Sequence, residues 1–442
     1  MKDAERVLEN AMRWVTPTSR QERSFGALAK WLLLRTRKAA ARYPETCGVQ
    51  LGGSFAKGTW VPGHVDLDIF VRFDPKTPED EFERLGLAVG STAARGFPRG
   101  KKFAQHPYTE AFVEGTRVNI VPCYAVKKGE WKSAADRSLF HVQVVKRLSA
   151  ESKTQIRLLK RFMNAVGVYG AEIETEGFSG YAAEVLVMKF SSLEGVLRYF
   201  AGFGPFGEQR LFSLSDPVDG ARDLATAISG EKLGRMILAS RGFLSKPRLA
   251  YFRMIRGREH QTLRGMVVAV VFSHRLLSED TLWGELRKTT KHLVRHLDLN
   301  GFKIARSLAA SDNKQCSAIL LIPEYDSLPL FEQRIGPTVD RRKDVEAFVS
   351  SSRRDAKLVW LDEEARARLL RPRRYVSLAD LLNDTVRGKA GPIGASSELE
   401  RGMRRRGSVL KGAPLMRAAS TSKWLDDGIR EIVSDALGIR AS

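Results

Sequence analysis

The chain has 442 residues, too many for one ordinary hydrophobic core, so roughly two to four domains are expected. Its 43% hydrophobic and 28% charged residues are typical of a soluble globular protein, and no apolar run approaches the roughly 18 residues that span a membrane. The net charge of +22 attracts polyanions, chiefly nucleic acid or an anionic membrane, and a basic proteome, an unusual salt environment or an Arg-rich codon bias is the equally open alternative.

The cysteines and the N-terminus bear on the location of the protein. Cys47, Cys123 and Cys316 lie far apart in the sequence, in neither a zinc-ligand nor a disulfide pattern, which favours a reducing cytoplasm. Residues 1–10 carry charges instead of an apolar stretch, so no signal peptide is expected. We therefore expect a cytoplasmic protein with no membrane partner.

The first half of the chain predicts helices followed by one sheet. Residues 5–41 have apolar side chains at helical spacing, and Pro17 divides this region into two helices. Strands are predicted over residues 48–51, 66–73 and 116–122. The last of these is expected to pair with residues 111–113 through a turn at Glu114 and Gly115.

The second half predicts a helical region and then a mixed one. Helices are expected over residues 151–166, 180–200 and 280–297. Strands are expected over residues 266–272, 316–323 and 357–361, and residues 377–442 return to helix.

A glycine-rich loop follows the first strand. Gly53 lets the backbone approach a phosphate group closely, Ser54 can donate its hydroxyl, and Lys57 can reach a phosphate oxygen. Taken alone, this loop is more often an ordinary turn.

Two aspartates lie on one face of the second strand. Asp66 and Asp68 are two residues apart, so both project from the same face, while Leu67 and Ile69 point toward a core. The two carboxylates repel each other unless a cation lies between them, and Mg²⁺ prefers such oxygen ligands. An exposed acidic strand edge is the alternative reading of the pair alone.

The loop and the aspartate pair together resemble the signature of polymerase-β-type nucleotidyltransferases. This resemblance implies that the loop would hold the triphosphate and that the pair would hold a metal ion between the phosphates and the attacking hydroxyl. The expected position of a third carboxylate is Asn119, an amide that carries no charge and cannot act as a base.

The chain further resembles the archaeal-type (class I) CCA-adding enzymes in motifs that follow one another in the family's order. They are Gly53–Trp60, Asp66–Phe70, Val121–Tyr124, Ser133–Arg137 before His141, Arg157–Phe162, Gly167–Glu172, Gly177–Tyr181, Asp216–Asp219 and Arg334–Pro337. The resemblance covers most of the chain, is dense over residues 48–230, and is thinner in the last hundred residues.

This resemblance implies an α+β fold with a nucleotidyltransferase head, a helical neck, and a mixed α/β body and tail. The implied limits are 1–141 for the catalytic head and 142–257 for the neck that selects the base. The body, which binds the tRNA acceptor stem, would cover 258–300 and 385–442, and the tail, which binds the T-arm, 301–384.

The resemblance also implies the reaction and its residues. CTP and ATP would donate C, C and A to the 3′ end of tRNA without a template, with Mg²⁺ bound by Asp66 and Asp68. The nucleotide would be bound by Gly53, Ser54, Lys57, His141, Lys160, Tyr169 and Arg222, the last as a base reader. Arg334, Arg341, Arg404, Arg405 and Arg406 are candidate RNA contacts, with solvated charge as the alternative for each patch. A homodimer is left open.

Asn119 leaves three readings of the catalytic position. In the first, the chain is an engineered trap that holds the nucleotide without reacting. In the second, it is a natural homologue whose catalysis is impaired or repurposed, and which binds tRNA or tails another RNA. In the third, Asn119 is not the position of the third carboxylate. The following Val121–Tyr124 motif argues against the last reading. We expect nucleotide binding to survive better than turnover.

Overall fold

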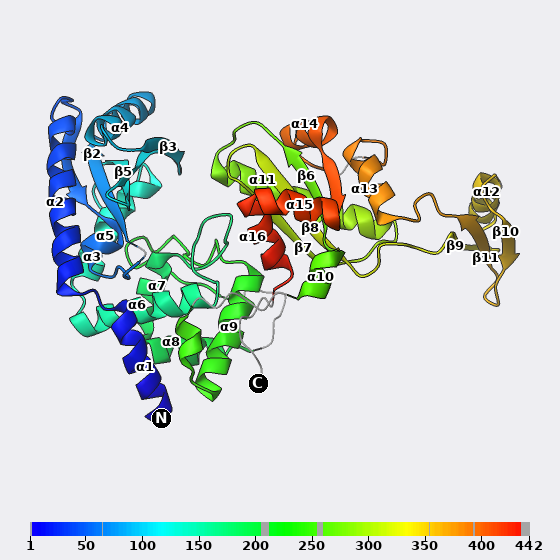
Figure 1. Ribbon diagram of the computed structural model, residues 1–442, viewed down its shortest axis with the longest axis horizontal. Helices are drawn as coiled ribbons and strands as arrows, with labels where there is room; N and C mark the ends of the chain where they lie inside the picture. Colours follow the sequence, from blue (N-terminus) through cyan, green and yellow to red (C-terminus); the bar gives the residue numbers. More distant parts are fainter. Residues whose placement is uncertain are drawn as a thin grey trace. The chain divides into compact units, whose positions relative to one another are not determined.

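The computed structural model describes residues 2–63, 65–204, 212–253, 260–352, 354–391 and 394–434 (Figure 1). Among these residues, 2–253 form one compact unit and 260–434 form another. The first unit combines one sheet with a layer of helices, and the second contains two further sheets, so the predicted α+β class is confirmed.

The chain begins with α1 (Lys2–Val15) and α2 (Ser19–Ala40), which separate at Pro17 as predicted. Thr18 begins α2 because its hydroxyl accepts a hydrogen bond from the Gln21 backbone N–H, while the Gln21 side chain accepts one from the Thr18 backbone N–H.

A five-stranded sheet in the order β1-β2-β5-β4-β3 forms the base of the candidate site. Its strands are β1 (Thr46–Leu51), β2 (Asp66–Phe73), β5 (Thr116–Tyr124), β4 (Pro107–Val113) and β3 (Arg99–Phe103). Strands β2 and β5 are parallel, and the other neighbours are antiparallel. The predicted turn between β4 and β5 is confirmed: Glu114 and Gly115 have φ values of 50° and 75°, which a tight hairpin requires.

One face of this sheet is covered by helices, which leaves the other face for chemistry. Helix α2 packs beside α4 (Glu79–Ala93), a helix that the sequence patterns did not predict. Leu32 of α2 and Phe82 of α4 are fully buried in the same core as Leu67 and Ile69 of β2. The side chains that alternate with Leu67 and Ile69 therefore point away from this core.

Beyond the sheet the first unit is helical. Helices α5 (Arg137–Lys146), α6 (Ala150–Ala165), α7 (Gly180–Phe190), α8 (Leu193–Ala201) and α9 (Gly230–Ser245) follow one another along the chain. The single helix predicted over residues 180–200 is wrong, because Ser191 ends α7 with a φ of 67°. Ser192 then caps α8 by accepting a hydrogen bond from the Gly195 backbone N–H.

The second unit contains a four-stranded sheet with helices on both faces. Its order is β12 (Ser408–Lys411), β6 (Val268–Ser273), β8 (Cys316–Pro323) and β7 (Ile304–Ser311). One core contains side chains of α11 (Glu279–Leu299), α13 (Leu378–Val386) and α14 (Ser397–Arg406), and the other contains side chains of α15 (Ala413–Thr421) and α16 (Lys423–Ile432). Because Val268, Val270 and Phe272 alternate with Ala269 along β6, this strand contributes to both cores.

Two predictions for this unit are corrected. Residues 377–442 are not helical throughout, because β12 interrupts them and pairs with β6, and residues 435–442 lie outside the described residues. The strand predicted over 266–272 begins later, because Met266 ends helix α10 (Gln261–Met266).

A separate three-stranded sheet is inserted between β8 and α13 (Figure 1). It consists of β10 (Leu358–Leu361), β11 (Arg366–Pro372) and β9 (Phe331–Thr338), with helix α12 (Arg342–Ser352) packed against β9 and β11. The chain enters and leaves this insertion side by side, since Ser327 and Ser377 form an isolated bridge.

Candidate active site

The aspartate pair lies at the start of β2, against the glycine loop. Helix α3 (Gly53–Lys57) follows β1, and the Gly52 backbone N–H donates to the Asp68 carbonyl at 2.8 Å. Gly53 has a φ of 62°, and a Cβ there would lie 1.8 Å from the Asp68 Oδ2 atom. Only glycine therefore fits beside the carboxylate in this backbone conformation.

Strand β5 places two polar side chains opposite the two aspartates. The parallel register sets Arg117 beside Asp66 and Asn119 beside Asp68. The Arg117 guanidinium donates two hydrogen bonds to the Asp66 carboxylate, Nε to Oδ1 at 2.9 Å and Nη2 to Oδ2 at 2.6 Å. The Asn119 amide donates to Asp68 Oδ1 at 2.9 Å.

The oxygen donors at this site fit a hard divalent cation. Burial raises the pKa of Asp68 above its ordinary value, although the hydrogen bond from Asn119 acts in the opposite direction. The Oδ1 atom of Asn119 is buried without a hydrogen-bond partner among the described residues. A nearby dication favours the ionised form of Asp68, and the unpaired amide oxygen of Asn119 could donate a lone pair to it as a ligand. The Asp66 carboxylate already accepts hydrogen bonds from Arg117.

Two lysines meet a buried carboxylate beside this pair. Lys57 of α3 donates to Glu184 Oε2 at 2.8 Å, and Lys160 of α6 donates to Glu184 Oε1 at 2.8 Å. The Thr59 hydroxyl donates to Glu184 Oε1 at 2.6 Å and accepts from Lys160 at 3.1 Å. Burial would raise the pKa of Glu184, but the two lysines outweigh it and hold the value at about 2. Glu184 is therefore ionised, and the three groups together carry one net positive charge.

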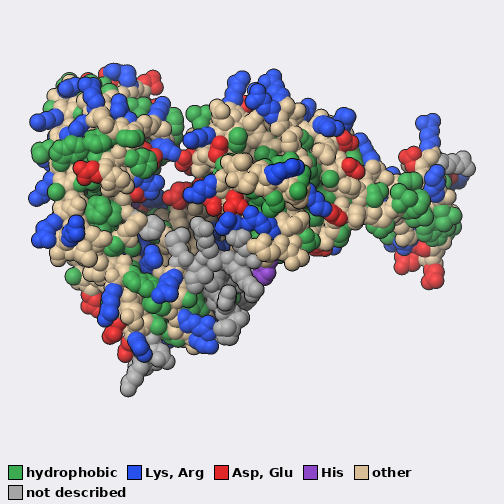
Figure 2. Space-filling view, viewed as in Figure 1, with side chains coloured by type: hydrophobic (Ala, Val, Ile, Leu, Met, Phe, Trp, Pro, Cys, Tyr) green, Lys and Arg blue, Asp and Glu red, His purple; other side chains and the backbone are tan. Residues whose placement is uncertain are grey.

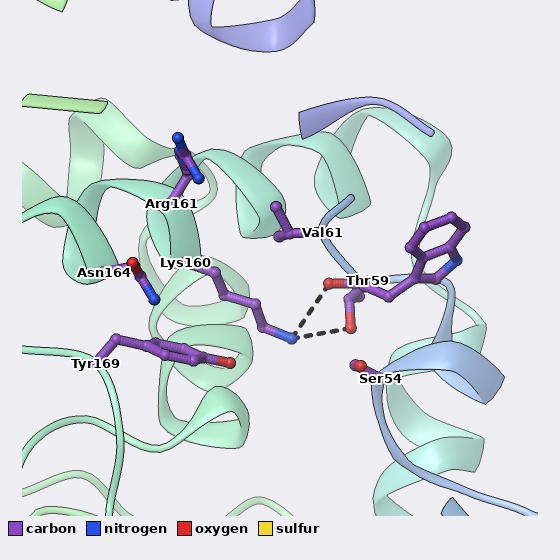
Figure 3. A pocket seen from close by; sticks show the side chains of 8 residues that line it. Ser54, Thr59, Val61, Lys160, Arg161, Asn164 and Tyr169 are labelled. Carbon is purple, nitrogen blue, oxygen red and sulfur yellow. Dashed lines mark hydrogen bonds between the residues drawn. The ribbon is translucent and has the colours of Figure 1, made fainter. Parts of the chain in front are cut away.

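Most of the predicted nucleotide-binding residues share one cleft. It is lined by Ser54, Lys57, Asp66, Asp68, Arg117, Lys160, Asn164, Tyr169, Tyr181 and Glu184, among others. Figure 3 shows Lys160 reaching from α6 toward Thr59, with the Tyr169 ring on one side and Ser54 across the pocket. Burial raises the pKa of Tyr169, so its phenol is a neutral donor. The Gly180 backbone lies so close that a Cβ there would stand 2.7 Å from the Tyr169 hydroxyl.

His141 and Arg222 meet at a second buried carboxylate, Asp216. His141 Nε2 lies 3.0 Å from Asp216 Oδ2, and a guanidinium nitrogen of Arg222 lies 3.5 Å from the same atom. The Tyr181 hydroxyl donates to Asp216 Oδ1 at 3.0 Å, and its ring stacks on His141 at 3.7 Å. Burial lowers the pKa of His141, so the ring is neutral near pH 7. Tyr181 lines the cleft with the lysines, whereas His141 lies behind its ring.

The candidate RNA contacts all lie on the second unit and are exposed. Arg404, Arg405 and Arg406 form the last turn of α14, where the helix dipole stabilises positive charge. Arg404 also pairs with Glu400 at 2.6 Å. Arg334 lies on β9, and Arg341 precedes α12. Lys and Arg side chains are spread widely over the visible surface, so charge alone does not mark one patch (Figure 2).

Sequence reasoning missed the groups that hold these side chains in place. Glu184 pairs with the two lysines and Asp216 pairs with His141 and Arg222, and both carboxylates are about 1% exposed. Arg117 is the third missed group, as the hydrogen-bond partner of Asp66. A signal for Glu184 was present, because it is the only charged residue in the otherwise apolar run Tyr181–Met188. A buried carboxylate needs a cationic partner, but nothing local identifies which lysines supply it.

Three family models match successive parts of the chain. "Nucleotidyltransferase domain" matches residues 35–145, "tRNA nucleotidyltransferase, second domain" matches 154–253, and "CCA-adding enzyme, C-terminal domain" matches 264–412. Within the described residues, no helix is long and apolar enough to cross a membrane.

Similar proteins span nearly the same length. A CCA-adding enzyme of Pyrobaculum neutrophilum is 36% identical over 403 residues, covering 88% of this chain and 95% of the relative. One of Pyrobaculum islandicum is 33% identical, with the same coverage of both chains, and one of Methanothermobacter thermautotrophicus is 32% identical over 76% of this chain and 78% of the relative. Together with the cleft built from Asp66, Asp68 and the two lysines, these matches show that the chain belongs to the family of CCA-adding enzymes.

Proposed function

We propose that this enzyme, a tRNA nucleotidyltransferase, adds C, C and A to the 3′ end of tRNA from CTP and ATP without a nucleic-acid template. The observation that carries the proposal is one cleft in which the β2 aspartates lie together with two buried lysines and Tyr169. The family membership is the second support, because the relatives span the whole arrangement of head and C-terminal regions.

Lys57 and Lys160 bind the triphosphate in this proposal. Glu184 neutralises one of their two charges and holds both ammonium groups within 2.8 Å of its oxygens. The remaining positive charge attracts phosphate, and the Ser54 and Tyr169 hydroxyls are neutral donors in the same cleft. Gly53 allows Asp68 to approach this loop.

Asp66 and Asp68 hold Mg²⁺ in this proposal, with the unpaired Oδ1 atom of Asn119 as a neutral third donor. The ion, when bound, neutralises the charge that develops on the transferred phosphoryl group. Asn119 cannot take the proton of the tRNA 3′-hydroxyl, because an amide has no basic lone pair. Asp68, which accepts the Asn119 amide at 2.9 Å, is the carboxylate beside this position.

His141 and Arg222 contribute to recognition of the base. Asp216 orients both through its Oδ2 atom. Tyr181, which donates a hydrogen bond to Asp216, lines the cleft and so connects this group to the nucleotide site. Arg222 is half-exposed and has further donors available for an incoming cytosine or adenine.

The proposed domains keep the expected limits of 1–141 for the head and 142–257 for the neck. The limits of 258–300 and 385–442 for the body and 301–384 for the tail change at one place: β7 and β8 move from the tail to the body, because they pair in the same sheet as β6 and β12. Arg404, Arg405 and Arg406 of the body contact the acceptor stem, and Arg334 and Arg341 of the tail contact the T-arm.

The proposal extends to the location and the oligomeric state of the enzyme. A cytoplasmic location is supported by three cysteines that form no disulfide. A homodimer is supported by the edge strand β10, where the exposed fractions of Leu358 and Leu361 are 56% and 58%. Light scattering of the purified chain measures the mass and decides this point.

The function is tested by incorporation of labelled CTP and ATP into tRNA transcripts that end before CCA. Ordered addition of C, C and A, absent in the Asp68→Asn variant, is the expected result. Asn119→Asp is the informative comparison, and we expect it to raise turnover more than nucleotide affinity. Equal rates for the two forms would show that the third carboxylate is dispensable here.

Asn119 favours a second candidate, a homologue that binds tRNA or tails another RNA. Addition by Asn119→Asp alone would identify an impaired enzyme of the same family. No addition by either form, together with retained tRNA binding, would favour the second candidate.

A further inference from the structure

The charge at the aspartate pair differs from that of a site built from three carboxylates. When both aspartates are ionised, Asp66 and Asp68 contribute two negative charges, Arg117 contributes one positive charge and Asn119 contributes none, so the net charge is −1. The only cation in contact with either carboxylate among the described residues is the Arg117 guanidinium. The Arg117 guanidinium thus already bonds to both carboxylate oxygens of Asp66, the atoms that a divalent ion would need as ligands.

The geometry of Arg117 is that of a strong but displaceable partner. Both hydrogen bonds to Asp66 come from one side of the guanidinium, as in bidentate ion pairs. The side chains of Arg117 and Asp66 remain 50% and 37% exposed, so water screens the pair and the guanidinium can turn without unpacking a core.

Arg117 also has an alternative partner within the same cleft. It lines the cleft together with Lys57, Lys160 and Ser54, the residues proposed to hold the triphosphate. A phosphate group matches the guanidinium fork as well as a carboxylate does. Phosphate can therefore draw Arg117 away from Asp66.

We propose that Arg117 is a built-in counter-ion that blocks the metal ligand Asp66 in the free protein and moves to the phosphates of the bound nucleotide. Metal binding is consequently weak without nucleotide and is coupled to nucleotide binding. The inference rests on the proposed function for the identity of the nucleotide, but its first test needs neither tRNA nor catalysis.

The first test measures binding of Mn²⁺ alone to the full chain by electron paramagnetic resonance. Arg117→Gln should bind Mn²⁺ about tenfold more tightly than the wild type, because it removes a positive charge from Asp66, a change within the usual range of site-to-site coupling. Arg117→Lys, which keeps the charge but loses the fork, should give a smaller change.

The matched control is Arg198→Gln. Arg198 contacts Glu194 through the same two donor nitrogens, Nε at 2.9 Å and Nη2 at 2.6 Å, although both bond to one oxygen, Oε1, on the exposed surface of α8. It does not line the cleft, so its loss should leave Mn²⁺ affinity unchanged. Equal Mn²⁺ affinity in the wild type and Arg117→Gln would overturn the proposal, provided that both unfold at the same urea concentration.

The second test measures CTP affinity by calorimetry in EDTA, where no metal ion competes. Arg117→Gln should bind CTP several-fold more weakly than the wild type, since it removes a group that binds phosphate. Unchanged CTP affinity would refute the movement of Arg117 to phosphate and leave it a fixed ion pair.

The outcomes separate this inference from the proposed function. Wild-type addition of CCA together with equal Mn²⁺ affinities refutes the inference and keeps the function. Tighter Mn²⁺ binding by Arg117→Gln, with no CCA addition by any form, refutes the function and keeps Arg117 as the counter-ion.

Discussion

Replacing Glu184 with glutamine should strongly destabilise the first unit. The variant keeps the shape of the side chain but removes the negative charge shared by Lys57 and Lys160. Breaking a buried ion pair from one side costs roughly 3–5 kcal/mol, because the partner charge stays buried. The pKa of Glu184 gives a similar figure: a decrease from 4.5 to about 2 corresponds to about 3 kcal/mol of stability.

The sign of the pH dependence follows from the same decrease. The pKa of Glu184 is lower in the folded than in the unfolded chain, so its stabilisation is complete above pH 4.5 and disappears as the pH falls toward 2. Urea unfolding, followed by tryptophan fluorescence, should therefore show about 3 kcal/mol between wild type and Glu184→Gln at pH 7 and a smaller difference at pH 3.5.

The control is Glu194→Gln, which removes an exposed carboxylate from its pair with Arg198 and should cost less than about 1 kcal/mol. A difference for Glu184→Gln that is below about 1 kcal/mol at pH 7, or that does not change with pH, would refute the reasoning. Either result would mean that the two lysines do not depend on this carboxylate.

Two further predictions concern the loop and the RNA. Gly53→Ala should reduce nucleotide incorporation by roughly 100-fold, since the new Cβ would meet Asp68. The control is Gly58→Ala, which should have a much smaller effect, because Gly58 also has a positive φ, of 72°, but a Cβ there would have no atom closer than 3.7 Å. Equal losses of activity would mean that backbone strain alone is responsible. Arg405→Gln with Arg406→Gln should lower the slope of log tRNA affinity against log salt by about 1 for each phosphate that is no longer neutralised, as filter binding at several salt concentrations measures. An unchanged slope would leave these arginines as solvated charge.

Short-range patterns made the aspartate pair and the loop beside it predictable from the sequence. The aspartate pair two residues apart, the glycine loop before it and the Glu114–Gly115 turn each depend on a few neighbouring residues. The structure places all of them as the local rules require.

Long-range partners could not be predicted in the same way. Glu184 contacts Lys57 across 127 residues, and Arg117 contacts Asp66 across 51. These contacts depend on strand register and helix packing, which no local pattern encodes. The break at Ser191 was missed for a different reason: a positive φ at a serine leaves no clear compositional signal.

Strand β12 was missed because of its length and surroundings. It has four residues and lies between the arginines of α14 and the helix α15. A strand this short is defined by its partner β6 and not by its own alternation.

The paired entry and exit of the inserted three-stranded sheet has a consequence for evolution. The strands of the four-stranded sheet come from residues 268–323 and 408–411, and the insertion leaves and rejoins the chain at the Ser327–Ser377 bridge. A segment attached through two adjacent ends can lengthen, shorten or be exchanged while the host sheet keeps its hydrogen bonds. The size and sequence of the insertion can thus diverge between relatives without a change in the strand pairing of the host sheet.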